Sequence, residues 1–288
     1  MHKEGFVQVE GGRVWYQMSG DVTKTPLVVL HGGPGSAHLS MRPLSALADE
    51  RPVILYDQLG CGQSDRPTDK SLWRIDRFVR ELATLRTALD LEKVHLLGHS
   101  WGTMLLADYL LTEPEGVKSA VFSSPCLSAP RWMADAMRYR RDLPEEIQNI
   151  LNACEASGDT DSAAYKEASK AYMNKHVCRI EIPAEQRQAR NAAFGAAVYN
   201  TMWGPSEFFA TGNLKDYDRT SRLPEIDVPA LFTCGHYDEA SPDSTRYYHS
   251  LVPGSRFHVF SNSAHMPQVE QTDEYIRVIR TFLQDVEA

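Results

Sequence analysis

Residues 94–102 have the sequence VHLLGHSWG, an apolar run that leads directly into a Gly-x-Ser-x-Gly motif. The run at 94–97 is compact and rich in Val and Leu, which suits a strand buried on both faces. A helical pattern begins at Thr103, so Ser100 falls between a strand and a helix, as a nucleophile elbow requires. We therefore expect Ser100 Oγ to stand at the carboxyl edge of a sheet. The alternative is a Gly/Ser turn that only caps a helix.

Short apolar runs alternate with helical patterns on both sides of this motif. Strand-like runs recur at 27–30, 53–56, 117–123, 230–234 and 256–260, and a hairpin is predicted from 6–9 and 14–17. Helical patterns occupy 75–89, 103–111 and 273–286. This alternation predicts an α/β fold, with a mostly parallel sheet and helices on both of its faces.

The strand-like runs stop between residues 127 and 221. Ala, Glu, Lys, Arg and Met dominate this segment, and prolines separate helical patterns at 131–141, 145–156, 162–176 and 184–198. We expect residues 127–221 to form a helical cap. The segments 1–126 and 222–288 would then form one discontinuous catalytic domain.

The charge balance excludes several classes of partner. The 288 residues carry 38 acidic and 30 basic side chains, a net charge of −8, which argues against nucleic acid and anionic membrane surfaces. No apolar stretch is long enough to span a bilayer, and residues 1–12 lack an apolar signal core, so a cytoplasmic location is expected. The five cysteines are widely spaced without a Cys-x-x-Cys pair, which indicates free thiols rather than a zinc site.

A serine nucleophile needs a general base, and chain position selects one of the ten histidines. In hydrolases with a strand–elbow–helix nucleophile the order along the chain is serine, acid, histidine. His265 lies in a loop that leaves the last predicted strand, where it can reach back over the sheet edge. His258 lies inside that strand, and His236 precedes the candidate acid. We predict His265 as the base.

The acid that orients this base is predicted to be Asp238. It follows the strand at 230–234, so it lies at the same edge of the sheet as Ser100. Asp243, on the same loop, is the runner-up and suits the cap of a following helix. Asp227 precedes the strand and therefore lies at the opposite edge.

A glycine-rich stretch, HGGPG at 31–35, leaves the strand at 27–30. The oxyanion of acyl transfer needs two N–H donors, and we predict those of Gly33 and Trp101. No Gly-Lys-Ser/Thr follows, which argues against a phosphate loop, and the stretch DQLGCGQSD at 57–65 lacks the third glycine of a dinucleotide fingerprint. The predicted chemistry requires no cofactor and no metal.

Three motifs together closely resemble the proline iminopeptidase family of α/β hydrolases. They are HGGPG at 31–35, DQLGCGQS at 57–64 and GHSWG at 98–102, and the resemblance extends over nearly the whole chain. The run YNTMWGPSEF at 199–208 is most similar to the tricorn-interacting aminopeptidase branch. The resemblance implies an α/β-hydrolase fold with an inserted cap. It also implies that Glu207, Glu239 and Tyr199 bind the free amino group of the substrate.

Ionisation chemistry supports this role for the carboxylates. A free α-amino group has a pKa near 7.7–8.0 and is mostly cationic at neutral pH. Two carboxylates beside Ser100 would hold that ammonium one residue from the nucleophile, whereas an internal peptide segment would leave them unpaired. The alternatives are a solvated cap side chain for Glu207 and a surface charge for Glu239.

The aromatic residues Trp203, Phe208 and Phe209 admit two interpretations. They would form an apolar pocket for a proline ring or another nonpolar side chain, or they would form the core of the cap. In the first case the large indole of Trp203 would reshape the pocket for the first residue of the substrate.

The sequence predicts a serine aminopeptidase that releases the N-terminal residue, often proline, from short peptides through an acyl-enzyme on Ser100. An amidase or esterase that acts on amino-acid amides or other small acyl compounds would use the same machinery. A third alternative, from a different class, is a non-catalytic small-molecule receptor on the same fold. The intact set of nucleophile, base, acid and two oxyanion donors favours an enzyme.

Overall fold

The computed structural model describes residues 2–20 and 23–288. Within these residues, eight strands form one sheet in the order β1-β2-β4-β3-β5-β6-β7-β8. β1 (His2–Val9) pairs antiparallel with β2 (Gly12–Ser19), as the predicted hairpin requires, and β2 pairs antiparallel with β4. All other pairs of neighbouring strands are parallel. The predicted α/β class is confirmed.

The six remaining strands coincide closely with the apolar runs of the sequence. They are β3 (Leu27–Leu30), β4 (Val53–Tyr56), β5 (Val94–His99), β6 (Val117–Ser123), β7 (Ala230–Gly235) and β8 (Arg256–Phe260). Every residue of β3, β4, β5 and β7 is buried. A strand that is covered on both faces has no solvent-facing side, which is why these runs are mostly apolar and do not alternate with polar residues.

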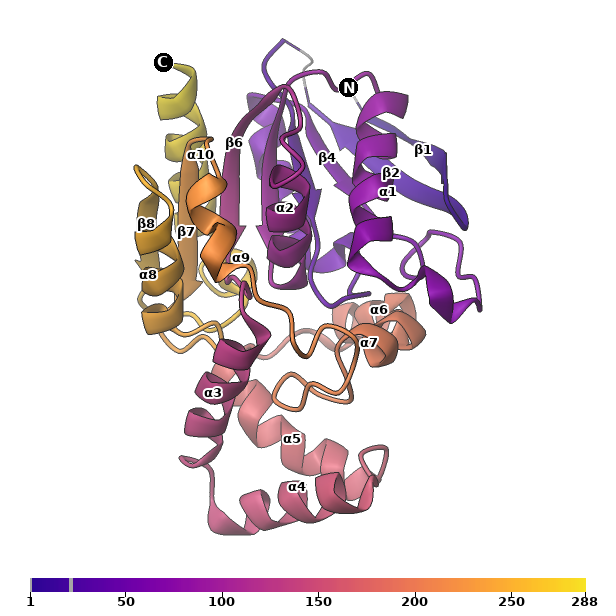
Figure 1. Ribbon diagram of the computed structural model, residues 1–288, viewed down its shortest axis with the longest axis vertical. Coiled ribbons are helices and arrows are strands. Elements are labelled where there is room, and N and C mark those ends of the chain that lie inside the picture. Colours follow the sequence, from indigo (N-terminus) through magenta and orange to yellow (C-terminus); the bar gives the residue numbers. More distant parts are fainter. Residues whose placement is uncertain (1, 21–22) are drawn as a thin grey trace.

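Helices cover both faces of the sheet (Figure 1). α1 (Ile75–Ala88), α2 (Trp101–Leu110) and α8 (Pro242–Leu251) share one hydrophobic core with alternate residues of the strands. The remaining strand residues belong to a second core, which η1 (His38–Asp49) and α10 (Thr272–Glu287) enclose on the other face. The alternation of strand residues between two cores places the sheet between two layers of helices.

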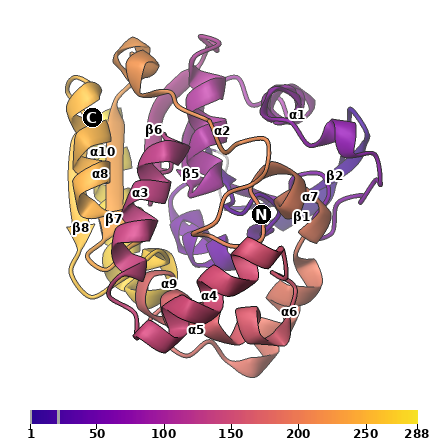
Figure 2. The ribbon, with the colours of Figure 1, turned by 60° about the horizontal axis from the view of Figure 1, so that its bottom comes forward.

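Between β6 and β7 the described chain contains helices and no strand. The helices are α3 (Ala129–Arg140), α4 (Glu145–Ser157), α5 (Ala163–His176), α6 (Ala184–Ala193) and α7 (Ala196–Met202). Figures 1 and 2 show that they lie beyond one end of the sheet, the end at which the parallel strands finish. α3, α4 and α5 enclose a small hydrophobic core of their own.

One prediction in this segment is wrong. The pattern at 184–198 predicted a single helix, but the structure has two, α6 and α7, which are separated at Phe194 and Gly195. The N–H of Gly195 donates to the carbonyl oxygen of Gly35 over 2.9 Å. A Cβ on Gly195 would lie 2.5 Å from the carbonyl oxygen of Gly60. The helix breaks because the chain passes close to two loops at the sheet edge.

The shorter helices are η2 (Lys70–Leu72), η3 (Thr220–Glu225) and α9 (Pro267–Glu270). Among the described residues, no helix combines the length and the apolar character that crossing a bilayer requires.

Candidate active site

Ser100 lies in the sharp turn between β5 and α2, with φ 55° and ψ −123°. A positive φ at a non-glycine residue costs on the order of 1–3 kcal/mol and is common at functional sites. The glycines of the motif permit the close packing around this turn. A Cβ on Gly98 would collide with the carbonyl oxygen of Gly102, and a Cβ on Gly102 would collide with that of Leu30. The motif therefore has the geometry of a nucleophile elbow.

His265 is hydrogen-bonded to Asp238 and lines the same cleft as Ser100. Its Nδ1–H donates to Oδ1 of Asp238 over 2.7 Å. The fully buried carboxylate of Asp238 also accepts hydrogen bonds from the N–H groups of Gly235 and Ala240, at 3.1 and 2.8 Å. These bonds fix the carboxylate and the imidazole, and they leave Nε2 of His265 available as a base.

The alternative acids and bases occupy other positions. Asp243 lies in the first turn of α8, whose N-cap is Ser241. Asp227 precedes β7 and so lies at the sheet edge opposite to Ser100. His258 lies within β8, with Nε2 3.4 Å from Oε1 of Glu274.

A second buried histidine, His99, anchors the loop of His265. Its Nε2–H donates to the main-chain oxygen of His265 over 2.8 Å, and the two rings lie 4.9 Å apart. Burial lowers the pKa of His99 to about 3, so this ring remains neutral. His99 holds the base without competing for its proton. The sequence analysis did not assign it a role.

The negative charges around His265 outweigh the effect of its burial. Burial disfavours the imidazolium, but the charge and hydrogen bond of Asp238 and the charge of Glu207 favour it. The net result is that the pKa of His265 is raised above its ordinary value of 6.5. A raised pKa makes the neutral imidazole a stronger proton acceptor.

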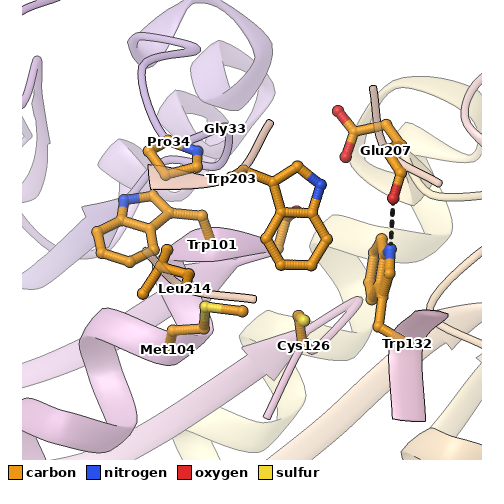
Figure 3. A pocket seen from close by; sticks show the side chains of 10 residues that line it. Gly33, Pro34, Trp101, Met104, Cys126, Trp132, Trp203, Glu207 and Leu214 are labelled. Carbon is orange, nitrogen blue, oxygen red and sulfur yellow. Dashed lines mark hydrogen bonds between the residues drawn. The ribbon is translucent and has the colours of Figure 1, made fainter. Parts of the chain in front are cut away.

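The two predicted oxyanion donors border the same small pocket as Ser100 (Figure 3). Within the described chain, the N–H groups of Gly33 and Trp101 have no acceptor, so both are free to donate. Gln58 connects the two segments that carry these N–H donors. Its Oε1 accepts from the indole N–H of Trp101 at 2.8 Å, and its side-chain NH₂ donates to the carbonyl oxygen of His31 at 3.2 Å.

The stretch at 57–64 forms a structural turn that supports this wall. Oδ1 of Asp57 accepts from the backbone N–H and from Nδ1 of His38, at 2.7 and 2.8 Å. Oδ2 of the same carboxylate accepts from the N–H of Gln63 at 2.8 Å. Asp57 therefore ties the loop after β3 to the loop after β4, in agreement with the interpretation of this stretch as a turn.

Glu207, Tyr199 and Glu239 come together beside the base. Oε1 of Glu207 accepts from the hydroxyl of Tyr199 over 3.0 Å. Oε1 of Glu239 lies 3.9 Å from Nε2 of His265. Glu239 is only 1% exposed, and the nearby hydroxyl of Tyr172 favours its charge, but neither carboxylate oxygen has a hydrogen-bond partner in good geometry within the described residues. The structure thus brings together all three residues that the resemblance assigned to the substrate amine.

Both carboxylates bind protons more tightly than an exposed glutamate does. Burial raises the pKa of Glu207, and the nearby His265 only partly offsets that effect. Burial raises the pKa of Glu239 well above its ordinary value, and the negative charges of Glu207 and Asp238 raise it further. A cation placed between these carboxylates would relieve their mutual repulsion.

Ser100 is one of ten residues that line a small pocket, and Figure 3 labels the other nine. Its walls comprise Gly33, Pro34, Ser100, Trp101, Met104, Cys126, Trp132, Trp203, Glu207 and Leu214. The indole N–H of Trp203 donates to the carbonyl oxygen of Ser206 at 3.1 Å, and that of Trp132 donates to the carbonyl oxygen of Glu207 at 2.9 Å. These bonds hold both indoles in place. The free volume is about 10 Å³, roughly that of one water molecule.

The aromatic residues Trp203, Phe208 and Phe209 lie in three different surroundings. Trp203 lines the small pocket, Phe209 lines a larger cleft, and Phe208 is fully buried in the core of α3, α4 and α5. Trp132, on α3, lines the small pocket, whereas Phe208 does not. No local pattern distinguished Trp132 from other apolar residues of the helical segment.

The larger cleft, of about 940 Å³, meets the small pocket at Ser100. His265, Tyr199 and Glu207 line it, as do side chains from α5, α6 and α7. The two cavities thus share Gly33, Ser100 and Glu207 as lining residues.

Neither a metal cluster nor a disulfide occurs in the described part of the chain. No group of three or more His, Cys, Asp or Glu side chains within residues 2–20 and 23–288 is arranged to hold a metal ion. The five cysteines are free thiols.

Comparisons with known proteins show the family of the chain. A family model described as the alpha/beta hydrolase fold matches residues 25–272. The chain is 53% identical over 288 residues to a proline iminopeptidase of Heyndrickxia coagulans, with 99% of this chain and 100% of that protein covered. The crystal structure of VinJ superposes with a TM-score of 0.94 at 34% identity, over 99% of each chain. A proline iminopeptidase structure from Mycobacterium smegmatis gives 0.90 at 34% identity, over 99% of this chain and 98% of that one.

Proposed function

The chain belongs to the proline iminopeptidase family of α/β hydrolases, and we propose that it is a serine aminopeptidase that releases the N-terminal residue of short peptides. The observation that supports this most is the pair Glu207 and Glu239. Neither carboxylate has a lysine or arginine partner within the described residues, and both lie beside the base. A substrate ammonium supplies the missing positive charge.

In the proposed acylation step Ser100 Oγ attacks the carbonyl carbon of the first residue. His265 Nε2 takes the hydroxyl proton, while Asp238 holds the imidazole through Nδ1. The oxyanion accepts hydrogen bonds from the N–H groups of Gly33 and Trp101. His265 then passes the proton to the leaving amine as the C–N bond breaks. A water molecule, activated by the same histidine, hydrolyses the acyl-enzyme.

In this account the substrate amine decides where the chain is cut. Its ammonium lies between Glu207 and Glu239, and the hydroxyl of Tyr199 fixes Glu207. Only one residue separates the amine from the scissile bond, so cleavage releases a single residue. A buried ion pair of this kind loses about 2–5 kcal/mol when one partner is truncated.

The two cavities have different tasks in this proposal. The side chain of the first residue faces the small pocket, where Trp203 leaves little free space, and the rest of the peptide occupies the larger cleft. Helices of the segment 127–221 line that cleft, so we assign this segment as a cap on a catalytic domain formed by 1–126 and 222–288. Short peptides fit such a covered cleft better than folded proteins do.

The test compares free peptides with the corresponding amides and esters in the wild type and in Ser100→Ala. The proposal requires peptide hydrolysis by the wild type and none by the variant, whose circular dichroism and melting temperature should be unchanged. Turnover of amides and esters without peptides would indicate an amidase or esterase instead. Labelling of Ser100 by a fluorophosphonate without turnover of any acyl substrate would favour a receptor.

A further inference from the structure

The larger cleft contains one arginine whose charge has no partner. Besides the two histidines His99 and His265, the acidic and basic side chains at its wall are those of Asp161, Lys166, Arg190 and Glu207. Lys166 Nζ lies 3.8 Å from Oδ1 of Asp161, so these two charges pair with each other. Within the described residues, no carboxylate lies within 4.0 Å of the Arg190 guanidinium. The cleft therefore presents a free cation as well as the free anion of Glu207.

Arg190 lies in the larger cleft beside the loop that carries His265. It is in the last turn of α6, and its Nη1 lies 4.0 Å from Sδ of Met266, the residue that directly follows His265. The side chain is half-buried, and burial lowers the pKa of its guanidinium. An arginine nevertheless stays charged at neutral pH, so this group is a partly desolvated cation in need of an anion.

A short peptide carries the two charges that this cleft lacks. Its ammonium suits Glu207 and Glu239, and its other fixed charge is a carboxylate. Guanidinium and carboxylate form two parallel hydrogen bonds, which give both affinity and a fixed orientation. We propose that Arg190 binds a carboxylate on the leaving-group side of the substrate, which in a short peptide is the C-terminus. This inference rests on the proposed aminopeptidase function.

Binding of both ends of the substrate would make the enzyme selective for peptides of a particular length. An extended residue spans about 3.3–3.6 Å, so only certain peptides place the ammonium at the glutamates and the carboxylate at Arg190 together. The enzyme should prefer free peptides of that length to the same peptides with an amidated C-terminus.

The experiment measures kcat/KM for di-, tri- and tetra-alanine, each as the free acid and as the C-terminal amide. The enzymes are the wild type, Arg190→Gln, Arg190→Lys and the control Arg187→Gln. Arg187 is an exposed arginine of the same helix that lines a different pocket. At the preferred length, the acid-to-amide ratio should fall about tenfold in Arg190→Gln, as expected for one lost charged hydrogen bond. Arg190→Lys should retain part of the ratio, and Arg187→Gln should match the wild type.

A second pair of substrates, Ala-Glu-amide and Ala-Gln-amide, separates the two sources of a carboxylate. If Arg190→Gln changes only the Glu-to-Gln ratio, the site binds an acidic side chain instead of the C-terminus. If neither ratio changes at any length, the proposal is wrong, while cleavage of the amides by the wild type would still support the aminopeptidase function. Failure of the wild type to cleave any of these peptides would contradict that function itself.

Discussion

Oε1 of Glu239 lies 3.9 Å from Nε2 of His265, although neither oxygen of this buried carboxylate has a hydrogen-bond partner in the described part of the chain. A buried charge without a partner is unfavourable unless a proton or a cation neutralises it. The amine of a peptide is such a cation. If the amine binds as we propose, the cation that neutralises Glu239 also lies beside the proposed base His265.

Binding of a peptide should release protons from the enzyme. Glu239 has a pKa well above its ordinary value in the free protein, because burial and two neighbouring carboxylates disfavour its charge. An ammonium reverses this effect and lowers the pKa of Glu239. Calorimetric titration of Ser100→Ala with a dipeptide, in buffers of different ionisation enthalpy, should show net proton release near pH 7. Glu239→Gln in the same background should reduce it, and a binding enthalpy that does not depend on the buffer would contradict this account.

The acid limb of the pH profile should move when Glu207 loses its charge. His265 must be neutral to accept a proton, so kcat/KM falls as the pH drops through its pKa, which is raised above 6.5. The charge of Glu207 contributes to that increase. Glu207→Gln should therefore lower the pKa of His265 and shift the acid limb to lower pH. The control Glu92→Gln removes an exposed charge just before β5, at the opposite sheet edge, and should leave the limb in place.

Trp203 should limit the size of the first residue. Its indole is fixed by a hydrogen bond and closes a pocket with about 10 Å³ of free volume. Trp203→Leu should raise kcat/KM for leucyl relative to alanyl arylamide by about tenfold or more, because one or more methylene groups gain space. Phe209→Leu changes the larger cleft only and should leave the ratio unaltered. Equal ratios in Trp203→Leu and the wild type would remove Trp203 from the wall that contacts substrate.

His99 should act on turnover by positioning His265. Its Nε2–H bonds to the main-chain oxygen of His265, and its neutral ring donates no proton to the reaction. His99→Phe removes the donor and should lower kcat roughly five- to tenfold, the equivalent of one hydrogen bond of about 1 kcal/mol. His99→Gln keeps a donor and should retain more of the wild-type kcat. A kcat unchanged in both variants would show that the loop needs no such anchor.

Most of the fold could be predicted because its signals are local. The buried parallel strands are continuous apolar runs, and the elbow around Ser100 needs glycines at fixed positions. The order of serine, acid and histidine then selected Asp238 and His265 from many candidates, and the structure brings these two side chains into hydrogen-bond contact.

The walls of the cavities could not be predicted, because they depend on contacts between distant segments. Trp132 and Arg190 belong to ordinary helical patterns, and only the packing of the helices between β6 and β7 against the sheet edge brings them to the two cavities. The break at Gly195 arises in the same way, from the approach of loops that contain Gly35 and Gly60. Periodicity within one segment carries no information about such neighbours.

The most direct test of the central claim compares alanyl arylamide with its N-acetylated form in the wild type and in Glu207→Gln. The account predicts that the wild type strongly prefers the free amine, because only an ammonium pairs with Glu207 and Glu239. Glu207→Gln should lower kcat/KM for the free amine roughly 30-fold, which corresponds to a loss of about 2 kcal/mol of transition-state stabilisation. The same substitution should change kcat/KM for the acetylated substrate far less. Equal cleavage of the two substrates by the wild type would contradict the claim that these carboxylates bind the substrate amine.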